Sequence, residues 1–159
     1  MAKKKKLPDD IRRECLSIVS GYERRVREYY DRRMEIICGT PKRFVEIGDQ
    51  MSKDGEWAYM PSNHDASRTA ENIALALNAL ETSPETLKIR AVEKAKRFIG
   101  SDIEDADLKR RLADAIMLNC RSGRRFPYAC FDLTGIEQTN FYDRRTEFLT
   151  FIAKDLGIM

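Results

Sequence analysis

The apolar positions of this chain recur mainly with helical spacing, and the clearest example covers residues 8–38. Large apolar side chains in that segment alternate at intervals of four and three residues, which is the spacing of a helical seam: Cys15, Val19, Tyr22, Val26 and Tyr29, with Ile36 further on. Gly39 and Pro41 end the pattern, because glycine closes helices and proline cannot resume one. We therefore predict one long helix over residues 8–38.

A helix of this length requires a neighbour for its apolar stripe. At about 1.5 Å per residue it is about 45 Å long, and the remaining chain is too short to enclose it. The neighbour is either an antiparallel helix of the same chain or a second subunit, which would make a homodimer through the N-terminal helix. The arginines of "ERRVREYYDRR" are interleaved with acidic residues at salt-bridge spacing, which indicates a solvated face and not an RNA-binding stripe.

Residues 40–65 interrupt the helical pattern with two prolines and two glycines. Two short runs in this segment, "RFVEI" and "EWAYM", have the composition of strands. The segment is therefore predicted to form either a small β-hairpin or an irregular connector.

The helical pattern returns at about residue 66 and continues to the end of the chain. Ser83 followed by Pro84 predicts a helix start, since a hydroxyl caps the first turn and proline fits its first position. The spacing predicts the buried face of this helix: Leu87, Ala91, Ala95 and Phe98. Ser101 and Glu104 match a capping box for the next helix.

These patterns together predict an all-α fold in three parts. Residues 1–6 form a basic tail, residues 7–65 hold the long helix and the connector, and residues 66–159 form a helical domain. The chain has 159 residues, of which 42% are hydrophobic and 35% are charged, so it can bury a core beneath solvent-facing helices. Its net charge of +3 permits nucleic-acid binding without requiring it. The lysines at residues 3–6 are interpreted either as a solubilising tail or as an arm that touches phosphates.

Several classes of protein are disfavoured by the sequence. No apolar run approaches a membrane span, and "MAKKKKLPDD" lacks the apolar run of a secretory signal. The four cysteines have no paired spacing and His64 is the only histidine, so reduced thiols are expected and a metal site is not. No nucleotide-binding loop or catalytic triad motif is found. The sequence predicts a cytoplasmic protein without membrane association that is not an enzyme and needs no cofactor.

The segment "TGIEQTNFYDRRTEFLTFIAKDLGIM" has the pattern of a helix-turn-helix ending. Gly135 supplies the positive φ that a tight turn needs, and Ile136 can lock the two helices together. Phe141 falls where the second helix points an apolar side chain back into the angle. The first helix of the unit is predicted over "PYACFDLT", and the second runs from about Glu137 to Leu156.

The last helix is predicted to have different neighbours at its two ends. Its second half carries a core stripe: Phe148, Leu149, Ile152, Ala153 and Leu156. Its first half faces outward and can enter the major groove of double-stranded DNA. The positions predicted to contact bases or phosphates are Gln138, Thr139, Asn140, Tyr142, Asp143, Arg144 and Arg145. Before the turn, the cluster of Arg121, Arg124 and Arg125 is predicted to lie over phosphates, although a helix end attracts cations in any case.

Three stretches, "LPDDIRRECLSIVSGYERRVREYYDRRMEII", "VEKAKRFIGSDI" and "GIEQTNFYDRRTEFLTFIAKDLGI", resemble the RinA/ArpU-like transcriptional regulators of phages and prophages. The resemblance covers most of the chain outside roughly residues 40–65. In that family a Gly-Ile-Ser-x-x-x-Phe-Tyr-x-x-Arg-type motif opens the last helix, and the C-terminal half is related to region 4 of sigma factors. The resemblance implies DNA binding through this helix and control of phage-type gene expression.

Carried over by position, the motif's aromatic pair corresponds to Phe141 and Tyr142, and its basic pair corresponds to Arg144 and Arg145. Two positions depart from the pattern. Glu137 stands where a Ser or Thr cap is typical, and it adds a negative charge near the expected phosphate. Phe131 stands where helix-turn-helix units usually have a small residue.

Two other functions stay open from the sequence. One is a phage helical assembly or adaptor protein, such as a small terminase-like subunit that forms a ring through the long helix. The other is an interaction module that keeps the helix-turn-helix shape but binds only protein, for instance RNA polymerase. The sequence does not specify the DNA site, the target genes, or whether the regulator activates or represses.

Overall fold

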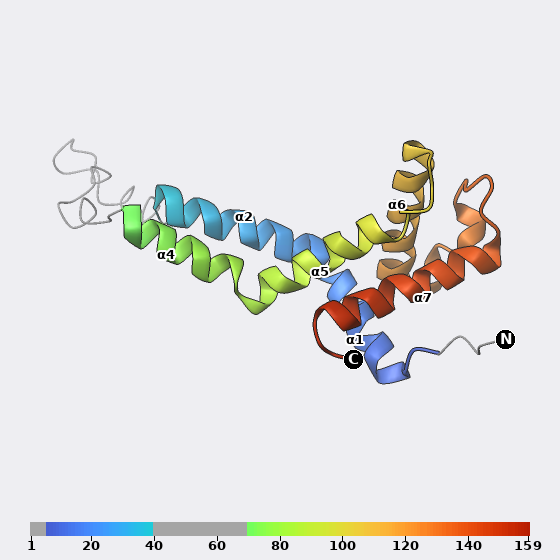
Figure 1. Ribbon diagram of the computed structural model, residues 1–159, viewed down its shortest axis with the longest axis horizontal. Helices are drawn as coiled ribbons and strands as arrows, with labels where there is room; N and C mark the ends of the chain where they lie inside the picture. Colours follow the sequence, from blue (N-terminus) through green and yellow to red (C-terminus); the bar gives the residue numbers. More distant parts are fainter. Residues whose placement is uncertain (1–5, 40–69) are drawn as a thin grey trace, which may run out of the picture. The chain divides into compact units, whose positions relative to one another are not determined.

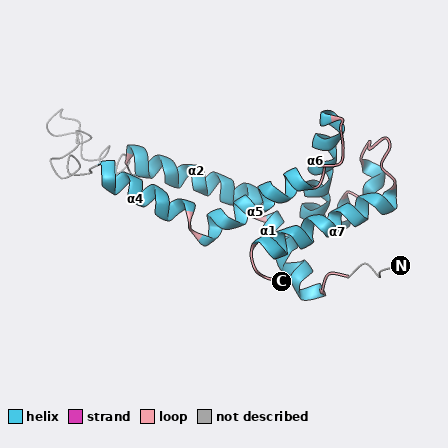
Figure 2. Cartoon of the chain, viewed as in Figure 1, coloured by secondary structure: helices cyan, strands magenta, loops and turns pink. Residues whose placement is uncertain are grey.

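The computed structural model describes residues 6–39 and 70–159, and every regular element in that part of the chain is helical (Figure 2). The α-helices are α1 (Asp9–Ser20), α2 (Tyr22–Cys38), α4 (Ala70–Glu81), α5 (Pro84–Phe98), α6 (Ala106–Ser122) and α7 (Gln138–Asp155). Two short 3₁₀ helices, η1 (Gly123–Arg125) and η2 (Tyr128–Cys130), lie between α6 and α7. The all-α prediction is confirmed for these residues, and the predicted β-hairpin lies outside them.

The chain forms two compact units. The first contains the described residues 6–25 and 87–159, and the second contains residues 26–39 and 70–86. Each unit therefore combines segments that are distant in the sequence.

The first unit is built on mutual contacts among α1, α6 and α7 (Figure 1). Their apolar faces join residues of α5 in one core, whose largest fully buried side chains include Phe141, Phe148, Leu112, Ile116, Leu149 and Ile152. Burying a side chain of this size stabilises the fold by roughly 1.5–3 kcal/mol. The predicted core stripe in the second half of α7 is therefore confirmed, with Leu156 half-buried at its end.

The predicted single helix over residues 8–38 is divided in the structure at Gly21, which separates α1 from α2. The Arg25 side chain folds back over this glycine, and its Nη1 donates a 2.6 Å hydrogen bond to the carbonyl oxygen of Ile18. A Cβ atom at position 21 would lie 2.7 Å from that nitrogen, so a side chain there would displace the guanidinium. Apolar spacing cannot predict this break, because it depends on a charged side chain filling the space over a glycine.

The second unit contains a direct link between α2 and α4, because the hydroxyl of Tyr29 donates a hydrogen bond to the carboxylate of Glu81. The start of α5 follows the prediction: Ser83 Oγ accepts a 3.4 Å hydrogen bond from the backbone N–H of Thr86. Thr86 is itself buried, and its hydroxyl donates a 2.7 Å hydrogen bond to the carbonyl of Leu80. The predicted cap at Ser83 is confirmed.

The buried face predicted for α5 is only partly correct. Ala91 and Ala95 are fully buried, whereas Leu87 and Phe98 are 48% and 47% exposed. Val92, which follows Ala91 in the sequence, is fully buried in the core as well. The buried face of α5 therefore agrees with the predicted stripe in the middle of the helix and differs from it at both ends.

The capping box predicted for the next helix is wrong. Helix α6 begins after Asp105, whose carboxylate accepts hydrogen bonds from the backbone N–H groups of Asp107 at 3.0 Å and Leu108 at 3.4 Å. Asp105 is a good N-cap for the reason that Ser101 was expected to be one: its side-chain oxygen satisfies N–H groups of the first turn. The four residues before Asp105 are left as a loop between α5 and α6.

Among the described residues, no helix is both long and apolar enough to cross a membrane. All four cysteines are free thiols; Cys15 and Cys120 are buried, whereas Cys38 and Cys130 are exposed. Burial raises the pKa of the Cys15 thiol to about 11, so this thiol is a neutral core residue.

Candidate nucleic-acid interface

The turn before α7 has the local geometry that the sequence predicts. Gly135 has a φ of 91°, a conformation that a side chain would strain. The backbone N–H of Ile136 donates a 3.0 Å hydrogen bond to the carbonyl of Leu133, and both side chains are buried. The hydroxyl of Tyr128 donates a hydrogen bond to the carbonyl of Ile136. The direction in which α7 leaves the turn is therefore fixed by backbone conformation, burial and hydrogen bonding.

The element before this turn is shorter than predicted. The segment "PYACFDLT" contains only η2, a single 3₁₀ turn, where the helix-turn-helix pattern predicts a first α-helix. The preceding α-helix is α6, which ends at Ser122 before Gly123 with a φ of 64°. Of the predicted helix-turn-helix, the structure contains the turn at Gly135 and the second helix, α7. In place of the predicted first helix it has only the 3₁₀ helix η2.

Phe141 is the centre of an aromatic cluster that anchors the start of α7. Its side chain is fully buried, and its ring centroid lies 5.6 Å from Tyr128, 5.8 Å from Phe131 and 5.2 Å from Tyr142. Phe131 therefore fills the space over Phe141, at a position where a small residue was expected. Aromatic pairs at these distances stabilise a fold beyond the area that they bury.

The first turn of α7 is exposed at every position before Phe141. Glu137, Gln138, Thr139 and Asn140 are all exposed, and the side chain of Glu137 makes no capping hydrogen bond. The first backbone N–H groups of a helix have no partner within the helix, and they carry the positive end of its dipole. The three uncharged side chains and these N–H groups therefore form one polar surface, which we call the α7 first-turn surface.

Arg144 lies behind this surface and is bound to the α5–α6 loop. Its Nη1 and Nη2 donate hydrogen bonds of 2.8 and 2.6 Å to the two carboxylate oxygens of Asp102. Nη1 also donates to the carbonyl of Ile99 at 2.9 Å, and Nε donates to Oδ1 of Asn140 at 2.6 Å. The Arg144 side chain is only 16% exposed. The arginine predicted to bond guanine or phosphate is thus occupied in holding α7 to the rest of the unit.

The ionisation of Asp102 reflects this contact. The hydrogen bonds from Arg144 lower the pKa of the Asp102 carboxyl from 3.8 to about 2. The same contact raises the pKa of the Arg144 guanidinium. Both groups are therefore charged at neutral pH, although solvent screens the pair because the Asp102 side chain is 62% exposed.

Arg145, Tyr142 and Asp143 are half-buried. Arg145 lies against Cys120: burial raises the pKa of that thiol to about 11, and the nearby guanidinium partly opposes the increase. Among the described residues, the buried Nε of Arg145 has no hydrogen-bond partner. The hydroxyl of Tyr142 accepts a 3.4 Å hydrogen bond from the backbone N–H of Tyr128. Tyr142 therefore contacts the aromatic cluster and Arg145 contacts α6, so neither side chain belongs to the α7 first-turn surface.

The arginine cluster before the turn is divided by the fold. Arg121 forms a 2.5 Å ion pair with Glu23 of α2. Arg125 is exposed, and the side chain of Arg124 lies outside the described part of the structure. Of the ten predicted contact residues, four are exposed in the structure and outside the ion pairs described above: Gln138, Thr139, Asn140 and Arg125. Arg121 is exposed but paired with Glu23.

Asp102, which determines the role of Arg144, was not identified from the sequence. Its two neighbours in the sequence, Ser101 and Ile103, gave no sign that it contacts a helix 42 residues away.

Among the described residues, no group of three or more side chains is arranged to hold a metal ion. No protein-family model matches the chain, and no curated protein or solved structure matches it either.

Proposed function

We propose that this chain is a DNA-binding transcriptional regulator of the phage or prophage type that places the α7 first-turn surface in the major groove. The observation that carries the proposal is the division of α7: its first turn is exposed, polar and without a side-chain cap, while Phe141 and the residues after it anchor the helix. A recognition helix needs both properties, because base edges are read only by side chains on a firmly held support.

Gln138 is the main candidate for contact with a base. Its exposed amide can donate and accept at once, which is the pattern needed for bidentate contact with adenine. Asn140 can donate from its amide nitrogen, while its Oδ1 already accepts one hydrogen bond from Arg144. Thr139 can contact a thymine methyl group or a phosphate. The backbone N–H groups at the start of α7 suit a phosphate oxygen.

Arg144 is a positioning residue in this proposal. By joining α7 to Asp102 and the Ile99 carbonyl, it fixes the orientation of the exposed turn, and it adds no free positive charge. Arg125 supplies an exposed cation, whereas Glu137 and Asp132 are exposed acids on the same segment. Because the described residues of this segment place few free cations beside the surface, affinity for DNA is expected to be weak and to require low salt.

The proposal predicts that Gln138→Ala weakens binding to a duplex selected from a random pool by about tenfold, the effect of one good base contact. Arg125→Ala should weaken binding to all duplexes alike and reduce the slope of log affinity against log salt by about one. Fluorescence anisotropy at low salt measures both effects. Arg110→Ala is the matched control, since it removes the same charge from an exposed position on α6. Equal affinity for all four proteins would contradict the proposed interface.

A further inference from the structure

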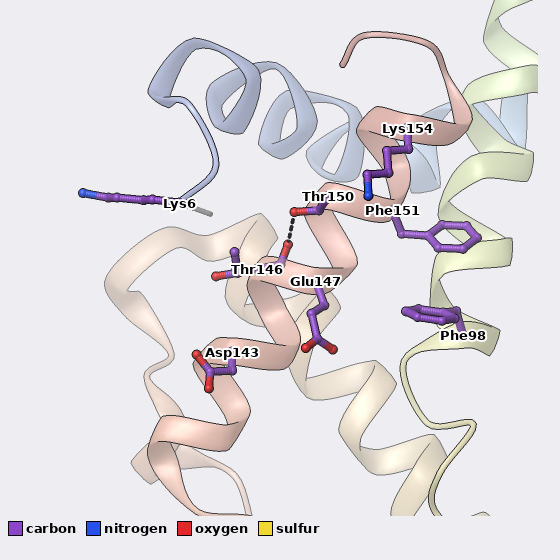
Figure 3. Close-up of a pocket in the computed structure, with 8 residues that line it drawn as sticks. All are labelled: Lys6, Phe98, Asp143, Thr146, Glu147, Thr150, Phe151 and Lys154. Atoms are coloured by element: carbon purple, nitrogen blue, oxygen red, sulfur yellow. Dashed lines mark hydrogen bonds between the residues drawn. The ribbon is translucent and has the colours of Figure 1, made fainter. Parts of the chain in front are cut away.

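A second surface of the first unit is unrelated to the α7 first turn. An open groove of about 480 Å³ runs beside the second half of α7 (Figure 3). Its floor is formed by the rings of Phe98 and Phe151, which stack with centroids 5.0 Å apart and an angle of 23° between their planes. Phe98 is nearly half exposed although its ring is large and apolar. The groove thus offers an aromatic floor that the chain's own core does not cover.

The charged residues that α7 contributes to this groove are ordered along the helix, and Lys6 lines the groove from the segment before α1. Asp143 and Glu147 precede the aromatic floor, and Lys154 follows it (Figure 3). Glu147, Phe151 and Lys154 are spaced at i, i+4 and i+7, so they share one face of the helix. In order, that face presents negative charge, an aromatic ring and positive charge.

The second unit carries an apolar stripe with the same spacing. Tyr30, Met34 and Ile37 lie at i, i+4 and i+7 on α2, and they are 56%, 55% and 47% exposed. Arg27 lies one turn before Tyr30 and is also exposed. Helix α2 ends directly after the stripe, at Cys38. In order, the α2 stripe presents positive charge, three large apolar side chains and the negative end of a helix dipole.

We propose that the α2 stripe of one copy docks into the α7 groove of a second copy, with the two helices parallel. In that register Tyr30 faces Glu147, Met34 faces the Phe98–Phe151 floor, and Ile37 faces the stem of Lys154. Both stripes span about 10 Å at a rise of about 1.5 Å per residue, so the three positions stay aligned along the contact. Methionine packs well against aromatic rings, which suits Met34 to the floor.

The charges agree with the same register. Arg27 lies at the end of the groove that carries Asp143 and Glu147. The Tyr30 hydroxyl can donate a hydrogen bond to the Glu147 carboxylate. At the other end, the Lys154 ammonium meets the C-terminal carbonyl groups of α2, where cations are favoured. Reversing α2 would place Arg27 beside Lys154, so the charges on α7 favour the parallel direction.

The contact differs in kind from a pairing of two N-terminal helices. It joins two different surfaces, so a bound pair of copies still exposes one free groove on one copy and one free stripe on the other. Such heterologous contacts extend into rings or open chains and do not stop at a dimer. Its few residues place it among weak, transient interfaces.

The test uses the full chain without DNA, at physiological salt, in sedimentation velocity from low micromolar to several hundred micromolar. Met34→Glu disables the stripe, and Phe98→Glu disables the groove by replacing one ring of its floor with a negative charge opposite Met34. Both positions are exposed, and circular dichroism verifies that both variants are folded. The wild-type average mass should rise with concentration, and each variant alone should stay monomeric. A one-to-one mixture of the variants should form dimers and nothing larger, because one intact stripe and one intact groove remain.

Three results would overturn the proposal. The first is a wild-type chain that is monomeric at the highest concentration. The second is a Phe98→Glu variant that associates like the wild type, which would indicate contact between two α2 stripes. The third is a mixture of the two variants that stays monomeric. If a variant is unfolded, the charge reversals Arg27→Glu and Glu147→Arg replace it: each alone should weaken association, and the two together in one chain should restore it.

Discussion

Replacing Phe141 by alanine is expected to lower the free energy of unfolding by about 3–5 kcal/mol, the usual cost of removing a fully buried phenylalanine ring. The ring is 0% exposed and contacts Tyr128, Phe131 and Tyr142, so its loss leaves a cavity that three aromatic neighbours cannot readily close. Denaturant unfolding followed by far-ultraviolet circular dichroism measures the change. A loss of this size is a large part of the stability of an ordinary domain.

Phe98→Ala is the matched control for this substitution. It removes the same side chain from a position that is nearly half exposed and stacks on one ring, Phe151. We expect it to cost at most about 1 kcal/mol. If the two substitutions had equal effects, the start of α7 would not be anchored by the aromatic cluster.

Replacing Arg144 by alanine is expected to lower the free energy of unfolding by about 2 kcal/mol at neutral pH, because hydrogen bonds from a charged donor to three partners are lost. The carbonyl of Ile99 and the amide oxygen of Asn140 lose their donor, whereas water partly replaces it at the exposed Asp102. Unfolding titrations of both proteins over a range of pH measure the difference.

The difference in the free energy of unfolding between the wild type and Arg144→Ala should become smaller in acid. Because the pKa of Asp102 in the folded protein, about 2, lies below its ordinary value of 3.8, the ion pair contributes fully above the ordinary pKa. That contribution is lost as the pH falls through about 2, when the carboxylate of the folded protein becomes protonated. Since Asp102 is largely exposed, the narrowing should be clearest at low salt.

Asp102→Asn separates charge from hydrogen bonding at the same site. The variant keeps the Arg144 bond to Ile99 but has no carboxylate to protonate. Its free energy of unfolding should therefore fall less than that of Arg144→Ala and should lack the acid-dependent contribution of the ion pair.

The positioning role of Arg144 would be contradicted by an Arg144→Ala variant that is as stable as the wild type yet no longer binds DNA. That result would mean that Arg144 leaves Asp102 and contacts the duplex directly.

Sequence patterns predicted those parts of the fold that depend on local physics. Gly135 was identified because few other residues tolerate a φ of 91°, and Phe141 because its spacing from the turn directs it inward. The two ends of α7 were distinguished by polarity alone, and burial follows that division at the first turn and in the second half, whereas residues 142–145 are half-buried. The cap at Ser83 depends on groups only three residues apart.

The features that sequence patterns missed depend on partners distant in the chain. Arg144 was predicted to contact DNA because it falls in the outward-facing first half of the last helix, yet it binds Asp102, which lies 42 residues away in the sequence. Phe98 fits a buried helical stripe, but the core excludes it, and its ring lies on Phe151 at the edge of a groove. Gly21 divides the first helix because Arg25 occupies the space above it.

The central claim, that the first turn of α7 contacts double-stranded DNA, is tested most directly by nuclear magnetic resonance. Amide spectra of the labelled full chain are recorded during titration with a mixed-sequence duplex at low salt. We expect the largest shifts from the backbone amides of Gln138, Thr139 and Asn140 and from the Gln138 side-chain amide, while the amide signals of α4 stay unchanged. Unchanged signals from the α7 first turn at saturating duplex, or shifts confined to other helices, would contradict it.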